Sequence, residues 1–127
     1  MDLQAFSEYM LCTKGSYFKL APHVDPQIAL GEPLKCVVTV LRAAAPEAGD
    51  AGVVVGCRPM GIWAIQGLAG NLLSSLIAVD IDNKKLELAK KYGATHVINP
   101  REQDAVKIIS QITNGKIEDF VIQTKKQ

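Results

Sequence analysis

The sequence is short of cysteine, of net charge and of long apolar runs, and each shortage excludes a class of protein. Three cysteines, Cys12, Cys36 and Cys57, are widely spaced and odd in number. They predict reduced thiols in a cytoplasmic protein rather than a disulfide-bonded domain. A formal net charge of +1 provides no basic excess for nucleic acid. No apolar run approaches the roughly 20 residues of a membrane-spanning helix, so we expect no membrane partner.

From residue 26 onward, the sequence has a regular alternation of strand-like and helix-like segments. Its 127 residues, 48% of them hydrophobic, suffice to bury one core. The patterns predict strands at 53–55, 76–79, 96–98 and 120–122, and helices at about 33–44, 59–69, 83–92 and 102–113. Such alternation predicts an α/β fold with a parallel sheet, and right-handed crossovers give the strand order 3-2-1-4. This is the first half of a doubly wound Rossmann sheet.

The segment before this alternation has a different character. Residues 5–20 are rich in aromatic side chains and predict one or two short strands. Pro26 suits the first position of a helix, whereas Pro33 is expected to break the periodic segment and delay the main helix to about residue 33. We therefore divide the chain into residues 1–25 and 26–127.

The link between the first predicted strand and its helix carries the strongest functional signal. Gly56 and Gly61 bracket the turn Gly-Cys-Arg-Pro-Met-Gly, and Pro59 suits the start of a helix. Glycines in such a turn allow a tight bend and a close approach to a pyrophosphate, which the helix N-terminus then binds. Asp80 ends the next strand 19 residues after Gly61, near the roughly 20 expected of a ribose-binding acid. The pattern predicts a dinucleotide site; the alternative is a doubly wound domain whose turn binds nothing.

Arg58 stands where this type of turn has its middle glycine. Its side chain either blocks the path of the pyrophosphate or swings aside and pairs with a phosphate. We expect weakened binding, because blocking needs only the usual loop geometry, whereas pairing needs a particular rotamer.

Several motifs resemble those of the medium-chain, zinc-type dehydrogenases, the group of alcohol, sorbitol and threonine dehydrogenases. The turn at 56–61 is similar to that family's Gly-Cys-Gly-Pro-Met-Gly. Further similar motifs are Phe-Ser-Glu-Tyr at 6–9, Glu-Pro-Leu at 32–34, Ala-Val-Asp-Ile-Asp at 78–82 and Val-Ile-Asn-Pro at 97–100. The resemblance covers nearly the whole chain. It implies that residues 1–25 are a remnant of catalytic-domain strands and that 26–127 are a partial NAD-binding Rossmann domain.

The resemblance also implies roles for single residues. Those that it places in the cofactor turn are Gly56, Arg58, Pro59, Met60 and Gly61. Asp80 matches the acid that binds both hydroxyls of the adenosine ribose and selects NAD over NADP. Lys85 matches a basic position that contacts the same ribose. Ordinary roles stay open for both residues, helix-entry capping for Asp80 and a solvated helix face for Lys85.

Glu32 matches an acid at or near the catalytic zinc in the polyol branch of the family. A catalytic zinc needs about three protein ligands and an open position, and the family's other ligands have no counterpart here. We therefore expect an incomplete metal site, no bound zinc, and NAD affinity that is weak or lost. The family's nicotinamide-binding half has no counterpart either, so we expect the chain alone to be inactive.

Expectations for the remaining features concern thiols, glycines and the sheet edge. Cys57, at a helix N-terminus, is expected to be partly exposed with a lowered thiol pKa, and the other two cysteines to be buried. Gly52, Gly67 and Gly70 stand where apolar or helix-favouring residues are usual and indicate relaxed constraints. A half-sheet leaves its fourth strand as an edge, which predicts a homo-oligomer formed there or by exchange of the N-terminal segment.

Three functions remain open from the sequence. The first is a dehydrogenase fragment with residual or lost NAD affinity. The second is a non-catalytic module that binds an adenine nucleotide such as AMP or ADP. The third is an interaction protein that keeps only the fold.

Overall fold

The computed structural model describes residues 8–116 and 118–124, and the chain divides into two compact units, Met1–Leu30 and Gly31–Gln127. In the first unit, a short 3-10 helix, η1 (Pro26–Ile28), has Pro26 at its start. Asp25 caps it, since its carboxylate accepts a hydrogen bond from the Gln27 N–H at 2.9 Å. Pro26 is thus a first helical residue, as predicted, although of a 3-10 turn.

The strands predicted within residues 5–20 are wrong for the part of that range that the structure describes. Residues 8–20 form turns and irregular backbone; residues 5–7 lie outside the described part. The aromatic side chains of Tyr9 and Phe18 are 90% and 94% exposed. A strand needs a hydrogen-bonded neighbour and a face to bury, and no strand is described elsewhere in this unit to supply either.

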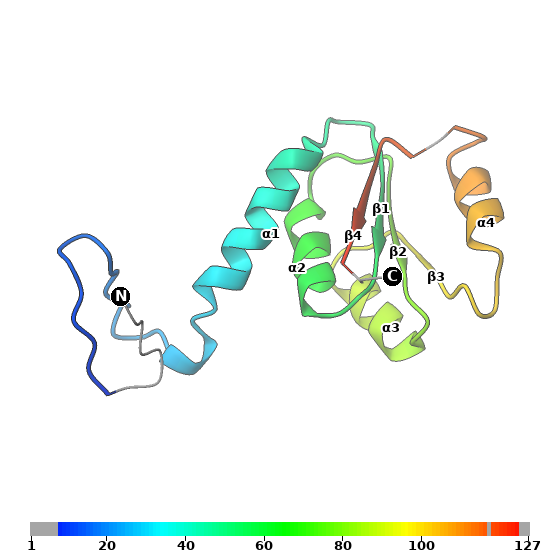
Figure 1. The fold of residues 1–127 in the computed structure, drawn as a ribbon. Helices are drawn as coiled ribbons and strands as arrows, with labels where there is room; N and C mark the ends of the chain where they lie inside the picture. The colour runs from blue at the N-terminus through cyan, green and yellow to red at the C-terminus, as the bar shows by residue number, and fades with distance from the viewer. Residues whose placement is uncertain (1–7, 117, 125–127) are drawn as a thin grey trace. The chain divides into compact units, whose positions relative to one another are not determined.

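The second unit is built on a parallel sheet (Figure 1). Its described strands are β1 (Ala51–Val55), β2 (Ser75–Val79), β3 (His96–Ile98) and β4 (Phe120–Gln123). They lie in the order β3-β2-β1-β4, and all three pairings are parallel. Val53 of β1 lies opposite Ile77 on one side and Val121 on the other. The predicted α/β half-sheet with order 3-2-1-4 is confirmed.

The helices cover both faces of this sheet. They are α1 (Gly31–Ala44), α2 (Pro59–Leu68), α3 (Asn83–Lys91) and α4 (Ala105–Ile112). Helices α1, α2 and α3 pack on one face around a core that includes Val37, Ile65 and Ala89. Helix α4 covers the other face, where Ile108 and Ile109 pack against the smaller core of β1, β2 and β3 (Figure 1).

Local signals set most helix ends, with two corrections. Asp82 caps α3, accepting from the Lys84 N–H at 3.0 Å, and Gly93 follows α3 with a φ of 116°, as predicted. Helix α1 begins at Gly31 rather than near Pro33, because a proline in the first turn removes no helical hydrogen bond. Helix α4 begins at residue 105, since Asp104 accepts from the Lys107 N–H at 3.1 Å and so caps it later than predicted.

The three glycines that we predicted to reflect relaxed constraints, Gly52, Gly67 and Gly70, have packing or backbone roles. A Cβ on Gly52 would overlap the ring of Phe120 on the neighbouring strand, and a Cβ on Gly67 would overlap Leu41 of α1. Gly70 follows α2 with a φ of 92°, a conformation that glycine adopts at little cost. For Gly52 and Gly67 the interpretation was wrong because these contacts join segments far apart in the sequence, and for Gly70 it was wrong because α2 ends at Leu68, before that glycine.

Among residues 8–116 and 118–124, no helix is long and apolar enough to cross a membrane.

Candidate nucleotide-binding site

The turn between β1 and α2 needs glycine at the two positions where the sequence keeps it. Gly56 has a φ of 95°, a left-handed conformation that strains other residues. A Cβ on Gly61 would collide with the carbonyl oxygen of Gly56, so α2 can approach the turn only with glycine there. The two glycines therefore fix the path of the backbone at the carboxyl end of β1.

Arg58 replaces the middle glycine without straining the backbone. Its φ of −73° and ψ of 175° are those of extended chain, which any L-residue adopts. The residue is exposed and stands immediately before Pro59, the first residue of α2. Its side chain makes no capping hydrogen bond to the helix, and no ion pair to Arg58 is found among residues 8–116 and 118–124.

Asp80, at the end of β2, holds the turn by two hydrogen bonds. Its Oδ2 accepts from the Cys57 N–H at 2.7 Å, and its Oδ1 accepts from the Asp82 N–H at 3.0 Å. Helix-entry capping falls to Asp82 instead, so the alternative role weighed for Asp80 is not the one observed. A carboxylate oxygen has two lone pairs, and each oxygen of Asp80 keeps capacity for a further donor.

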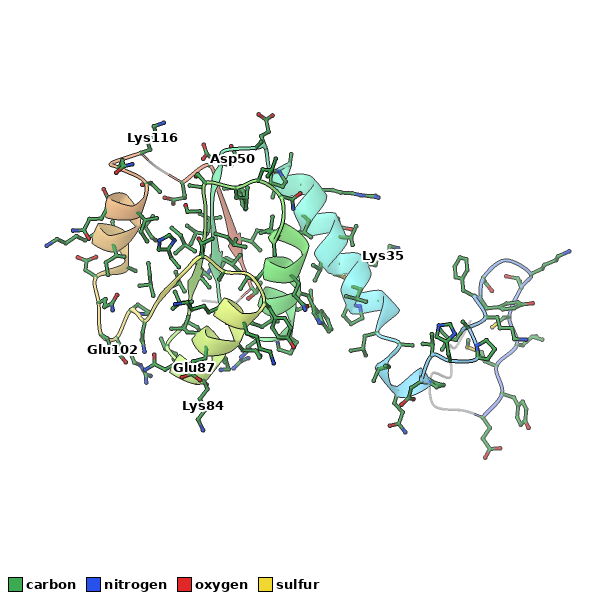
Figure 2. All side chains as sticks on the ribbon, turned by 180° about the vertical axis from the view of Figure 1, so that it is seen from behind. Lys35, Asp50, Lys84, Glu87, Glu102 and Lys116 are labelled. Atoms are coloured by element: carbon green, nitrogen blue, oxygen red, sulfur yellow. The ribbon has the colours of Figure 1, made fainter. Side chains whose placement is uncertain are left out.

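Lys85 lies in the first turns of α3 and forms an ion pair. Its Nζ is 3.2 Å from Oδ2 of Asp82. This hydrogen bond from Lys85 is the main reason why the pKa of Asp82 lies below its usual value. Lys84, the preceding residue, points away into solvent (Figure 2). The two lysines are adjacent in sequence but occupy different surroundings.

A small recess brings several of these residues together. Gly56, Arg58, Asp80, Lys85 and Thr124 are among the residues that line it, and its volume is about 60 Å³. Since one water needs roughly 10–15 Å³ of such accessible space, the recess has room for only a few water molecules. A pair of ribose hydroxyls fits such a space, whereas a whole nucleoside would have to extend over the surrounding surface.

The other predicted residues of the turn lie apart from the recess. Met60 faces an apolar hollow between α1, α2 and β4, where Val37 and Ile122 are among its neighbours. Pro59 begins α2 and Gly61 packs against the turn. These residues support the backbone of the turn but do not line the recess.

Thr124 also lines this recess, and no sequence motif pointed to it. Its Oγ1 donates to the carbonyl oxygen of Gly56 at 2.9 Å, and its N–H donates to Val55 at 2.9 Å. The available signal was its position: it directly follows β4, whose carboxyl end lies beside that of β1. Ligands of open α/β sheets bind at that edge.

The three cysteines depart from expectation. Cys57 is buried, with 2% of its surface exposed. Desolvation, followed by the nearby Asp80 carboxylate, raises its pKa to about 12, so the predicted lowering of this pKa is wrong. Burial outweighs the helix N-terminus because the thiolate would lose its hydration. Cys12 and Cys36 are exposed rather than buried.

Glu32 belongs to no group of metal ligands among the described residues. Its Oε1 accepts a hydrogen bond from the Cys36 thiol at 3.2 Å, one turn along α1. Within the described part of the chain, no three His, Cys, Asp or Glu side chains are grouped to hold a metal ion. A zinc ion therefore does not fit the donor set that these residues offer.

Comparison with known proteins identifies the family. Residues 59–125, which include α2, the turn's second glycine and Asp80, match the family model described as zinc-binding dehydrogenase. The chain belongs to the zinc-binding dehydrogenase family. The resemblance predicted from the sequence motifs is thus confirmed.

Related proteins show how much of a family member is present. The chain is 34% identical over 120 residues to the L-threonine 3-dehydrogenase of Bacillus subtilis, covering 93% of this chain and 34% of that enzyme. The alcohol dehydrogenase TADH of Thermus sp. ATN1 has a similar structure, with a TM-score of 0.76 and 28% identity over 87% of this chain and 32% of that one. A short-chain alcohol dehydrogenase of Escherichia coli CFT073, in complex with NADH, gives a TM-score of 0.72 at 25% identity, covering 87% and 33%. The chain spans about a third of the length of the zinc-binding dehydrogenases it matches.

Proposed function

We propose that this chain provides the adenosine side of an NAD site of a zinc-binding dehydrogenase, and that its 127 residues alone do not transfer hydride. One observation carries the proposal: Gly56, Asp80, Lys85 and Thr124, from four separate segments, line one recess beside the start of α2. That position is where the glycine turn and the acidic residue predict a nucleotide.

The residues of the recess have distinct tasks in this proposal. The Asp80 carboxylate, already anchored to two backbone N–H groups, accepts the ribose hydroxyls. Lys85 adds positive potential beside the ribose, although its ion pair with Asp82 reduces the effect. The first N–H groups of α2 face the phosphates. NAD, when bound, supplies the hydride acceptor, and these residues only position it.

Arg58 sets the affinity. It is exposed and lines the recess, and its extended backbone is not strained by a side chain. A pyrophosphate that follows the turn must displace its side chain, so we propose that the affinity for NAD is lower than with glycine at this position. The guanidinium partly offsets that loss only where a phosphate can reach it.

A second candidate is the binding of an adenine nucleotide without nicotinamide, such as ADP. The residues gathered around the recess serve an adenosine and its first phosphates, which ADP and NAD share. In that case the module binds nucleotides without catalysis.

Calorimetric titration with NAD and ADP separates the two, using the full chain and Arg58→Gly. Silence in the wild type with binding by Arg58→Gly supports a blocked NAD half-site. Equal binding of ADP and NAD by the wild type favours the second candidate. Absence of binding by either protein contradicts both.

A matched pair of lysine variants locates the site. Lys85→Gln removes a cation that lines the recess, whereas Lys84→Gln removes a neighbouring cation that points to solvent. In the Arg58→Gly background, we expect weaker nucleotide binding from the first variant and unchanged binding from the second. Equal losses from both would indicate only a general effect of net charge.

A further inference from the structure

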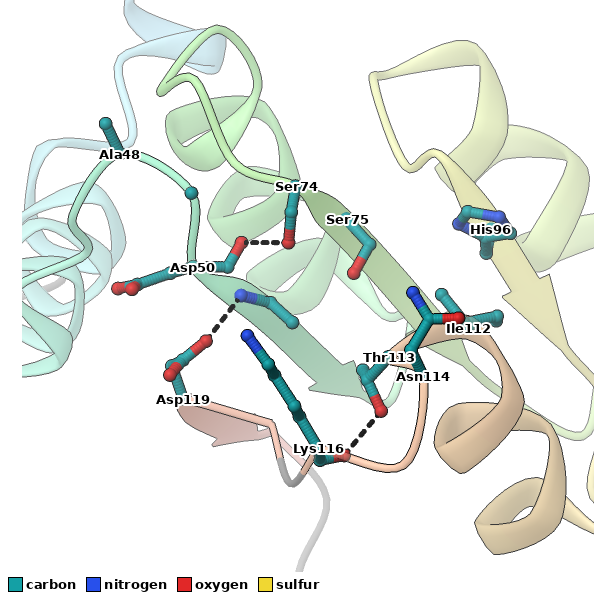
Figure 3. Close-up of a pocket in the computed structure, with 12 residues that line it drawn as sticks. Ala48, Asp50, Ser74, Ser75, His96, Ile112, Thr113, Asn114, Lys116 and Asp119 are labelled. Atoms are coloured by element: carbon teal, nitrogen blue, oxygen red, sulfur yellow. Dashed lines mark hydrogen bonds between the residues drawn. The ribbon is translucent and has the colours of Figure 1, made fainter.

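A larger hollow lies at the other end of the sheet, away from the glycine turn (Figure 3). Its volume is about 520 Å³, within the roughly 300–1,000 Å³ of small-molecule sites. Residues at the amino ends of the strands line it together with the segment after α4; among them are Ser75, His96, Asn114, Lys116 and Asp119. It is separate from the nucleotide recess, which lies at the carboxyl ends of the strands.

Ser75 presents its hydroxyl to this hollow although the rest of the residue is buried. The residue is only 4% exposed, and its side chain points into the hollow in Figure 3. Within the described residues, no side-chain hydrogen bond of Ser75 is found, whereas the adjacent Ser74 donates to the Asp50 carbonyl at 3.0 Å. Because no buried side-chain oxygen or nitrogen of the described residues lacks a partner, the Ser75 Oγ is reached by solvent from the hollow and is free to hydrogen-bond a ligand atom there.

Opposite charges stand at the rim. The Lys116 side chain extends into the hollow in Figure 3, and no ion pair of Lys116 is found in the described part of the chain. Asp119 uses Oδ2 to accept from the Ala51 N–H at 2.7 Å, which leaves Oδ1 available. Asp50, in contrast, turns its carboxylate to the Glu47 N–H at 2.8 Å.

These charges select among ligands. A simple anion attracted by Lys116 meets the carboxylate of Asp119, and a simple cation meets the ammonium of Lys116. A small molecule that carries both charges satisfies the two groups at once. The amide of Asn114 and the hydroxyl of Ser75 add hydrogen bonds near a bound carboxylate.

We propose that this hollow binds a small zwitterion of the α-amino-acid class, with its carboxylate at Lys116 and Ser75 and its ammonium at Asp119. The site does not depend on the proposed nucleotide function, because the two share no residue. Binding here would add a second ligand to a chain whose proposed nucleotide site is at the opposite edge of the sheet.

The test is an amide NMR titration of the full chain with individual L-amino acids, up to about 10 mM to cover dissociation constants near 1 mM. Acetate and methylammonium are the single-charge controls. We expect at least one amino acid to shift the amides of Ser75, Asn114 and Lys116, and neither control to do so. If acetate shifts them as strongly, or if no amino acid shifts them, the proposal is overturned.

Variants of the two proposed ligand groups check the assignment. We expect Lys116→Gln and Ser75→Ala each to weaken binding about tenfold or more, about 1.4 kcal/mol. Lys107→Gln, an exposed lysine on α4 outside the lining, should bind as the wild type does. Lys116→Arg, which keeps the charge, should retain part of the affinity even if the other variants fold poorly. Full binding by a folded Lys116→Gln protein, or complete loss in Lys116→Arg, contradicts the role given to Lys116.

Discussion

The carboxylate of Asp80 accepts a hydrogen bond from the backbone N–H of Cys57 at 2.7 Å, which joins the end of β2 to the turn after β1. The residue proposed to face the ribose therefore also holds the shape of the loop that faces the phosphates. Substitution of Asp80 changes stability and nucleotide binding together, so each has to be measured separately.

Asp80→Ala is expected to lower the free energy of unfolding by about 1–3 kcal/mol, because a hydrogen bond to a charged group is lost and the Cys57 N–H is left without its partner. Urea unfolding followed by circular dichroism measures the change. Glu87→Gln, an exposed acid on α3, is the matched control and should stay within about 0.5 kcal/mol of the wild type. Equal stability of Asp80→Ala and the control would remove the structural role given to this carboxylate.

Gly52→Ala tests the contact between β1 and β4. A methyl group on Gly52 overlaps the Phe120 ring, and overpacking of this kind costs about 1–3 kcal/mol. Thermal unfolding should show a lower Tm for Gly52→Ala and partial recovery when Phe120→Leu is added. Gly31→Ala, where a Cβ meets open space, should not be destabilised. A double variant no more stable than Gly52→Ala would mean that the ring does not cause the loss.

The outcome for these glycines shows where sequence patterns suffice and where they do not. The strands, the start of α2 at Pro59 and the cap at Asp82 follow from local signals: β-branched runs, a proline at a helix start and an aspartate before a helix. The strand order follows from the right-handed crossover rule. Gly52 was misread because its need for glycine arises from Phe120, 68 residues away.

The candidate site divides in the same way. Gly56, Gly61 and Asp80 follow from a spacing that the backbone imposes on any such turn. Thr124 was missed because only the pairing of β4 with β1 brings it to Gly56. The burial of Cys57 likewise depends on packing by distant elements, so its pKa shift had the opposite direction to that predicted from its place beside a helix N-terminus.

Burial of Cys57 predicts alkaline sensitivity. Its pKa is raised from 9.0 to about 12 in the folded protein, so above pH 9 the unfolded state loses this proton more readily than the native state. Stability is therefore full below about pH 9 and falls as the pH rises toward 12. Urea midpoints measured across this range should decline less steeply for Cys57→Ala than for the wild type.

Thiol counting provides the control for this prediction. An aromatic disulfide reagent should react with the exposed Cys12 and Cys36 in the native protein and with Cys57 only after unfolding. Rapid reaction of all three thiols in the native state would contradict the burial on which the alkaline sensitivity rests.

We propose that the chain forms a homodimer through β4. In the described part of the sheet, β4 pairs with β1 on one side only, and an unpaired edge can recruit a second copy. Light scattering coupled to gel filtration should give the mass of a dimer for the wild type. Val121→Lys, at a half-exposed position of β4, should shift the population toward monomer. A monodisperse wild-type monomer across concentrations would refute the proposal.

The most direct test of the nucleotide site is amide NMR of the full chain and of Arg58→Gly during titration with ADP. We predict shifts of the Gly56, Cys57, Asp80 and Lys85 amides, larger in Arg58→Gly, with no change at Ser75. Shifts confined to other parts of the chain, or none in either protein, would contradict the assignment of this recess to the adenosine side of the cofactor.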